Sequence, residues 1–190
     1  MAWALLRMGR PDEAEQLLER CIARGLPDAD CPWWANGTAG IAAVLDKAGA
    51  ALERADFTRM AGQQRRLTCE ALESGMPGRA GLLHGWAGVG LALLPLRSDG
   101  PSVGQAAAAL RLERGRLSMD GRVLTAVSGS RRMPYLGHGG LAAALLARML
   151  PPGSFGDDDA VLSLIAAAGA SCRSPHVLEA GLIRGRAGLL

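Results

Sequence analysis

Two kinds of hydrophobic pattern alternate along the chain. In the first, apolar residues recur at helical spacing among charged ones, as in segment 11–24, with Ala14, Leu17, Leu18, Cys21 and Ile22. In the second, the segment is apolar on every side, as in 88–94, which contains no polar side chain. An amphipathic helix covers a domain surface, whereas a helix that is apolar all round is buried. The pattern therefore predicts amphipathic outer helices that alternate with buried inner helices.

The predicted elements follow this alternation. Pro11 and the acids after it suit a helix start, and Gly25 suits its end. The other outer helices are expected over residues 50–73, with Gly62 as a candidate break, 103–112 and 157–172, and the inner helices over 39–48, 88–94 and up to about 150. One segment differs, because two short extended runs in 116–127, around Asp120-Gly121, predict a small β-hairpin.

A glycine turn precedes each inner helix and recurs four times. The turn glycines are Gly37 and Gly40, Gly85 and Gly88, Gly139, and Gly185 and Gly188. The first glycines of the four turns are 48, 54 and 46 residues apart. A helical repeat of about this length indicates stacked two-helix units. Closed in a ring, such units form an α/α toroid, so the predicted fold is all-α, with the glycine turns and the helix N-termini at one end.

Composition and charge limit the number of domains, the kind of core and the classes of partner. The chain has 190 residues, 49% of them hydrophobic but only 4% aromatic, so we expect a single domain whose core is built from Ala, Leu and Val. The net charge of +3 is scattered without a basic stripe, which argues against nucleic acid as a partner. The apolar helices are shorter than the about 20 residues that span a membrane, so no membrane partner is expected.

The N-terminus and the cysteines indicate a cytoplasmic protein. The short apolar run at the start is followed at once by Arg7 and Arg10, which does not fit a signal peptide. The cysteines, Cys21, Cys31, Cys69 and Cys172, form no C-x-x-C pair. Without an export signal, reduced thiols are the simplest interpretation.

The candidate site residues lie in the glycine turns. His84 suits proton transfer, because the histidine pKa lies near neutrality, or it merely bonds a backbone carbonyl at the helix start. His138 has a site role or is an ordinary turn residue. Trp86 and Tyr135 either line a substrate cavity or pack in the core. Arg184 and Arg186 either bind an acidic group of a peptide or are simply exposed.

Four motifs in order resemble the lanthionine synthetase C-like (LanC) cyclases. The resemblance is closest to the C-terminal domain of the kinase–cyclase lanthipeptide synthetases of classes III and IV, and it covers nearly the whole chain. The motifs are Leu83-His84-Gly85-Trp86-Ala87-Gly88, Leu117-Ser118-Met119-Asp120-Gly121, Met133-Pro134-Tyr135-Leu136 and residues 181–188.

This resemblance implies a thioether-forming cyclase. In the family, a cysteine thiol of a precursor peptide adds to a dehydrated Ser or Thr, and zinc-dependent members hold the metal with two Cys and one His. His84 matches an active-site histidine of these cyclases. The zinc-ligand positions fall on Gly137, Ile183 and Arg184, and the family aspartate falls near Trp33. We therefore expect no metal or other cofactor, as in the class III domains.

The resemblance also implies partners and a size. The partners would be a precursor peptide and the rest of a lanthipeptide synthetase. Residues 1–190 would form one incomplete toroid domain with about four of the about seven repeats, the fourth truncated, and this chain alone is expected to be inactive or poorly folded. The unmatched positions leave open a non-catalytic scaffold that binds a precursor peptide or a partner synthetase. A sugar hydrolase of the toroid class ranks last, because the glycine turns carry no carboxylates.

Overall fold

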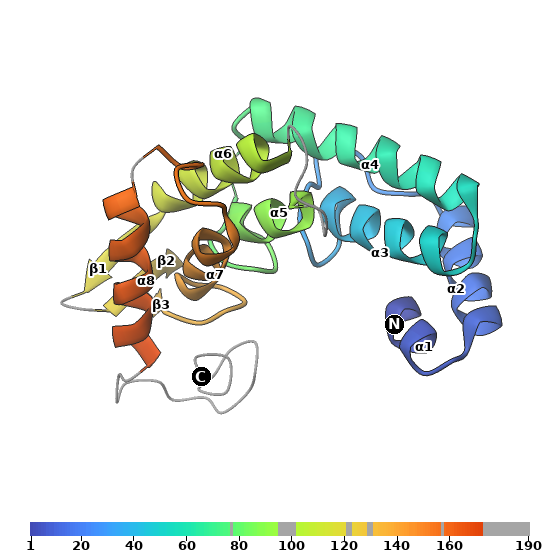
Figure 1. The fold of residues 1–190 in the computed structure, drawn as a ribbon, viewed down its shortest axis with the longest axis horizontal. Helices are drawn as coiled ribbons and strands as arrows, with labels where there is room; N and C mark the ends of the chain where they lie inside the picture. The colour runs from blue at the N-terminus through green and yellow to red at the C-terminus, as the bar shows by residue number, and fades with distance from the viewer. Residues whose placement is uncertain (77, 95–101, 121–122, 129–130, 157, 173–190) are drawn as a thin grey trace. The chain divides into compact units, whose positions relative to one another are not determined.

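The computed structural model describes residues 1–76, 78–94, 102–120, 123–128, 131–156 and 158–172, and this part of the chain is mostly helical (Figure 1). Two compact units divide the chain, Met1–Ser74 and Gly75–Leu190. The helices of the first unit are α1 (Ala2–Arg7), α2 (Pro11–Ala23), α3 (Thr38–Ala51) and α4 (Ala55–Glu73). The second unit contains α5 (Trp86–Leu93), α6 (Ser102–Arg114), β1 (Leu117–Asp120), β2 (Val123–Ser128), β3 (Arg131–Met133), α7 (Leu141–Met149) and α8 (Asp158–Cys172).

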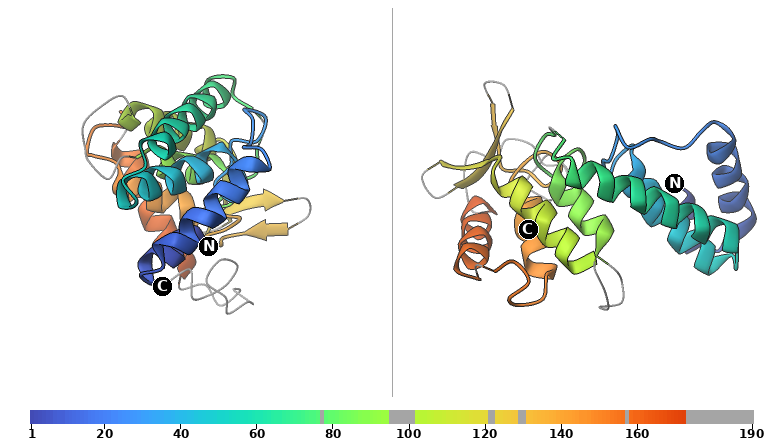
Figure 2. Two further views of the ribbon diagram at one scale, coloured as in Figure 1. Left: turned by 90° about the vertical axis from the view of Figure 1, so that its right-hand side faces the viewer. Right: turned by 90° about the horizontal axis from the view of Figure 1, so that it is seen from above.

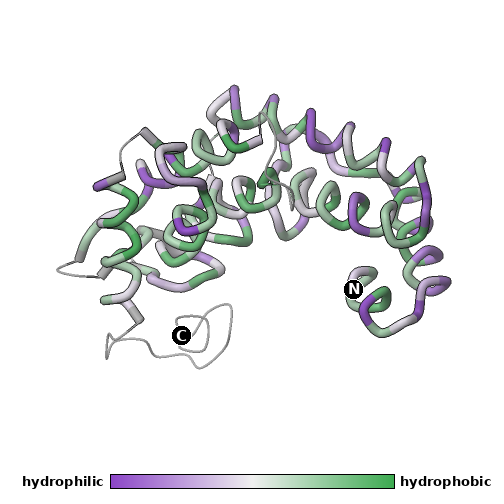
Figure 3. The backbone as a smooth tube through the Cα atoms, viewed as in Figure 1, coloured by the Kyte–Doolittle hydropathy of each residue, from purple (hydrophilic) through white to green (hydrophobic). Residues whose placement is uncertain are grey.

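In the first unit, α3 and α4 lie side by side (Figures 1 and 2). Leu18 of α2, Leu45 of α3 and Phe57 of α4 are buried in one hydrophobic cluster. Hydrophilic residues recur along α2 and α4, as expected for outer helices (Figure 3). Helix α1 was not predicted, because its six residues are too few to carry a full amphipathic repeat.

The first outer helix is confirmed, with Pro11 at its first position and Gly25 in the left-handed region just beyond its end. The predicted start of the next outer helix at residue 50 is wrong. Residues 50 and 51 belong to α3, and Glu53 turns the chain with a φ of 55° before α4 begins at Ala55. The candidate break at Gly62 is also wrong, since α4 continues through it.

Arg54 secures this turn between α3 and α4. Its guanidinium pairs with Asp56 at 2.7 Å and Glu19 at 3.2 Å, and it also pairs with Glu15. Hydrogen bonding to Arg54 lowers the pKa of Asp56 to about 2. The turn is therefore tied to α2 as well as to α4.

In the second unit, the predicted hairpin is confirmed and extended by a third strand. β1 pairs antiparallel with β2, with Leu117 opposite Ala126, and β2 pairs antiparallel with β3, with Ala126 opposite Met133. In Figure 2 the strands project beyond the helices of this unit. The hydrophobic core joins α6, α7 and α8 with Leu124 of β2.

The inner-helix expectation is confirmed for α5, where six of the eight residues are buried. None of the helices in the described ranges has the length and hydropathy to cross a membrane.

Candidate functional site

The second glycine turn requires glycine for both conformation and space. Gly81 has a φ of +112°, in the left-handed region that side chains disfavour. A Cβ added there would lie 2.5 Å from the carbonyl oxygen of Gly137. Gly85 is the N-cap residue of α5, with extended backbone angles. The turn is closed by the Arg79 N–H, which donates to the His84 carbonyl at 3.1 Å.

The second and third glycine turns are joined through their main chains. The Leu82 N–H donates to the Leu136 carbonyl at 2.9 Å, and the Leu83 N–H donates to the Gly137 carbonyl at 3.1 Å. Gly81 comes close to the same segment, since its Cβ would meet the Gly137 carbonyl. Two turns whose glycines are far apart in sequence thus form one surface.

This junction brings His84 and His138 together. Their rings are stacked, with centroids 5.7 Å apart and an angle of 5° between the planes. His84 is half-buried, and its Nδ1 atom is buried with no hydrogen-bond partner among the described residues. Within the described part of the chain, Nδ1 therefore does not make the bond to a backbone carbonyl that the alternative interpretation of His84 expected. The arrangement places two imidazoles, each able to accept or donate a proton, side by side.

A buried carboxylate, Glu113, supports the His84 turn and was missed in the sequence analysis. It lies in the last turn of α6 and is fully buried. Its Oε1 accepts the Gly81 N–H at 2.5 Å, and its Oε2 accepts the Ala87 N–H at 3.1 Å. A sequence signal existed, because Ala106, Ala109, Leu110 and Glu113 follow the spacing of one buried helix face.

Burial also changes the acidity of Glu113. Desolvation disfavours the charged form and raises the pKa of its carboxyl from 4.5 to about 7. The N–H groups of Gly81, Ala87 and Trp86 and the positive charge of Arg116 oppose this rise. Arg116 is held nearby, since its Nη1 donates to the Gly78 carbonyl at 2.5 Å.

The other predicted site residues lie in both units and in the C-terminal part beyond the described residues. Trp86 is fully buried at the start of α5, and Tyr135 is half-buried before the third turn. Gly88 is buried within α5, and Gly139 is buried two residues before α7 begins. The predictions for Gly185, Gly188, Arg184 and Arg186 lie outside the described residues.

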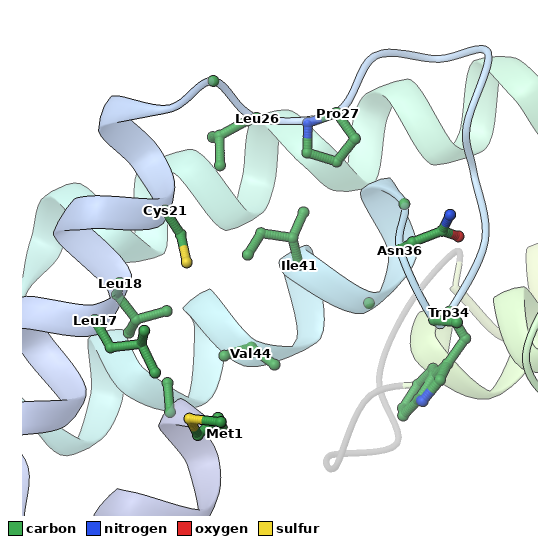
Figure 4. A pocket seen from close by; sticks show the side chains of 15 residues that line it. Met1, Leu17, Leu18, Cys21, Leu26, Pro27, Trp34, Asn36, Ile41 and Val44 are labelled. Atoms are coloured by element: carbon green, nitrogen blue, oxygen red, sulfur yellow. The ribbon is translucent and has the colours of Figure 1, made fainter.

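The first glycine turn lies in the first unit, beside a cavity. Gly37 is the N-cap of α3, and Asn36 occupies the place before the glycine that His84 and His138 hold in the other turns. The cavity has a volume of about 510 Å³, and Figure 4 shows Leu17, Leu18 and Cys21 of α2 on one side and Ile41 and Val44 of α3 on the other. Its lining is mostly apolar, with Trp34 and Asn36 at the turn.

Among the described residues, no group of three or more His, Cys, Asp or Glu side chains is placed to hold a metal ion. Cys21 and Cys31 are thiols, and Cys31 contacts the Asn36 carbonyl oxygen at 3.5 Å. What the described site offers is a pair of imidazoles, each able to take up or release a proton, on a frame of main-chain hydrogen bonds.

Comparison with models of protein families finds no match to this chain, and comparison with curated proteins finds none either.

Proposed function

We propose that this chain is part of a lanthionine synthetase C-like cyclase, which forms thioether rings in a precursor peptide. The observation that carries the proposal is the stacked pair of His84 and His138 on two joined glycine turns. The order of inner and outer helices supports an α/α toroid, with the glycine turns at the site. A precursor peptide already dehydrated at Ser or Thr is the proposed substrate.

The proposed reaction needs one base and one acid. His84 takes the proton from the cysteine thiol as its sulfur bonds to the β-carbon of the dehydrated residue. The carbon–carbon double bond opens, and its electron pair moves toward the carbonyl as an enolate. His138, protonated at the outset, gives its proton to the α-carbon. Water then carries the proton that His84 took up to His138, so that both imidazoles return to their starting states. The product has the same atoms as the substrate, so no co-reactant is consumed.

The test measures loss of peptide thiol, because cyclisation leaves the mass of the peptide unchanged. The natural polypeptide that contains residues 1–190 is incubated with a dehydrated peptide, and remaining thiols are trapped with N-ethylmaleimide before mass spectrometry. His84→Asn copies Asn36 of the first turn, and Arg148→Gln, on an exposed residue of α7, is the control. We expect H84N to lower the rate by about 10²- to 10⁴-fold and R148Q to leave it unchanged.

A non-catalytic scaffold that binds a precursor peptide is the second candidate. The apolar cavity between α2 and α3 favours it, because such a cavity accommodates the apolar side chains of a peptide. Peptide binding by fluorescence anisotropy, with a cyclisation rate equal to the rate without protein, would support the scaffold and overturn the cyclase.

A further inference from the structure

Glu113 holds the main chain on both sides of His84. Its two carboxylate oxygens accept the N–H groups of Gly81, three residues before His84, and of Ala87, three residues after it. Ala87 is the second residue of α5, so its N–H has no acceptor within the helix. A negative charge at this end of a helix is also favoured by the helix dipole. One carboxylate thus spans the turn and the start of α5.

The turn is also fixed to the third glycine turn, through the bonds of Leu82 and Leu83 to Leu136 and Gly137. The backbone that carries His84 is therefore held between a carboxylate and the segment that carries His138. The rings of His84 and His138 are stacked across this junction, with centroids 5.7 Å apart. We expect a change in the bonds to Glu113 to shift the His84 backbone, and with it this stacking.

We propose that Glu113 is a positioning residue, whose carboxylate sets the place of the His84 ring relative to His138 through the Gly81 and Ala87 N–H groups. The catalytic importance of this positioning depends on the cyclase proposed above. The positioning itself is a property of the fold and is measurable without substrate.

The charge state of Glu113 determines how many of the two N–H groups it can accept, and few other charged groups act on it. Helix α5 has no ionisable side chain, and α7 contributes only Arg148, which is exposed. On the turn itself, Arg79 is exposed and His84 is half-buried, and Arg116 is the cation that acts on the carboxylate. The ionised carboxylate accepts both N–H groups, whereas a protonated carboxyl presents a hydroxyl donor to one of them. Protonation therefore loosens one of the two bonds.

The experiment compares the wild type with Glu113→Gln by NMR, on the natural polypeptide that contains residues 1–190. The readouts are the Gly81 amide proton and the ring protons of both histidines. Glu73→Gln is the control, because Glu73 is an exposed glutamate in the other unit. In E113Q we expect an upfield shift of the Gly81 amide proton and loss of the ring-current shifts that stacked imidazoles impose on each other. E73Q should match the wild type.

Unchanged histidine ring shifts in a folded E113Q would overturn the positioning role. If E113Q does not fold, a pH titration of the wild type decides. The Gly81 amide proton should then shift as Glu113 titrates near pH 7, and a Gly81 amide that does not move would overturn the proposal.

Activity separates this inference from the proposed function. In the cyclisation assay, E113Q should lower kcat by about 100-fold and leave KM nearly unchanged, as expected for a displaced catalytic group. Altered histidine shifts in E113Q, with no cyclisation by the wild-type natural polypeptide, would remove the cyclase and keep the positioning role. Cyclisation by the wild type, with the same kcat and histidine shifts in E113Q, would keep the cyclase and remove the positioning role.

Discussion

Glu113→Gln should change how the stability of the fold depends on pH. The folded chain holds the Glu113 proton up to about pH 7, whereas the unfolded chain releases it near pH 4.5. Between these values the folded state binds more protons than the unfolded state, so the free energy of unfolding falls as pH rises. The contribution of this group is fully present below pH 4.5 and is lost as the pH passes 7.

The size of the effect follows from the same interval. Each pH unit between the two pKa values corresponds to about 1.4 kcal/mol, so the wild type should lose about 3 kcal/mol across the window. Glutamine does not titrate, and its amide group can accept only one of the two N–H groups at a time. The protonated carboxyl of the wild type likewise offers an acceptor to only one of them. E113Q should therefore be close to the wild type in stability at pH 4.5 and more stable than the wild type, by about 3 kcal/mol, above pH 7.

The assay is urea unfolding followed by circular dichroism at several pH values across this window. The difference in the free energy of unfolding between wild type and E113Q removes contributions from all other titrating groups. Glu73→Gln should give a curve parallel to that of the wild type, because Glu73 is exposed. A wild type minus E113Q difference that stays constant from pH 4.5 to above 7 would refute the assignment of a buried, titrating Glu113.

Three further substitutions test the turns and the core, each by thermal or urea unfolding. Gly81→Ala should destabilise by more than about 1 kcal/mol, because the residue has φ +112° and its Cβ would meet the Gly137 carbonyl. Gly62→Ala should stabilise by about 0.5–1 kcal/mol, since it lies within α4 with open space around a Cβ. A more stable G81A or a less stable G62A would contradict this interpretation of the glycines. Thr38→Val should cost about 1 kcal/mol, because it removes the buried 2.7 Å hydrogen bond to Thr68, and the exposed control Thr58→Val should not.

Local patterns predicted the helices and strands of the fold better than the boundaries between them. The buried helix α5 follows from its lack of polar residues, and the hairpin from the turn signal between two extended runs. The end of α3 was misplaced because alanines at 50 and 51 suit either helix, and only Glu53 shows where the chain turns. Gly62 did not break α4, because packing of an amphipathic helix outweighs the cost of one glycine, about 1 kcal/mol.

The candidate site was predicted only as separate residues. His84 and His138 were each found from their place before a turn glycine, but their stacking depends on main-chain bonds between distant turns, which no local pattern encodes. Glu113 was missed because an acidic residue in the last turn of a helix ordinarily faces solvent. An acid at the end of an otherwise apolar stripe signals a buried partner, and here the partner is the N-terminal end of α5.

The junction between the second and third turns is made of peptide groups, and this separates the geometry of the site from its chemistry. The Leu82 and Leu83 N–H groups bond to carbonyls whatever side chains those positions carry. The residue before the turn glycine is histidine in both of these turns and asparagine in the first, and the bonds that join the second and third turns do not involve this side chain. Such a frame lets an acid, a base or a neutral hydrogen-bonding group be installed at one fixed place by a single substitution, which makes these turns suitable positions for building new catalytic sites.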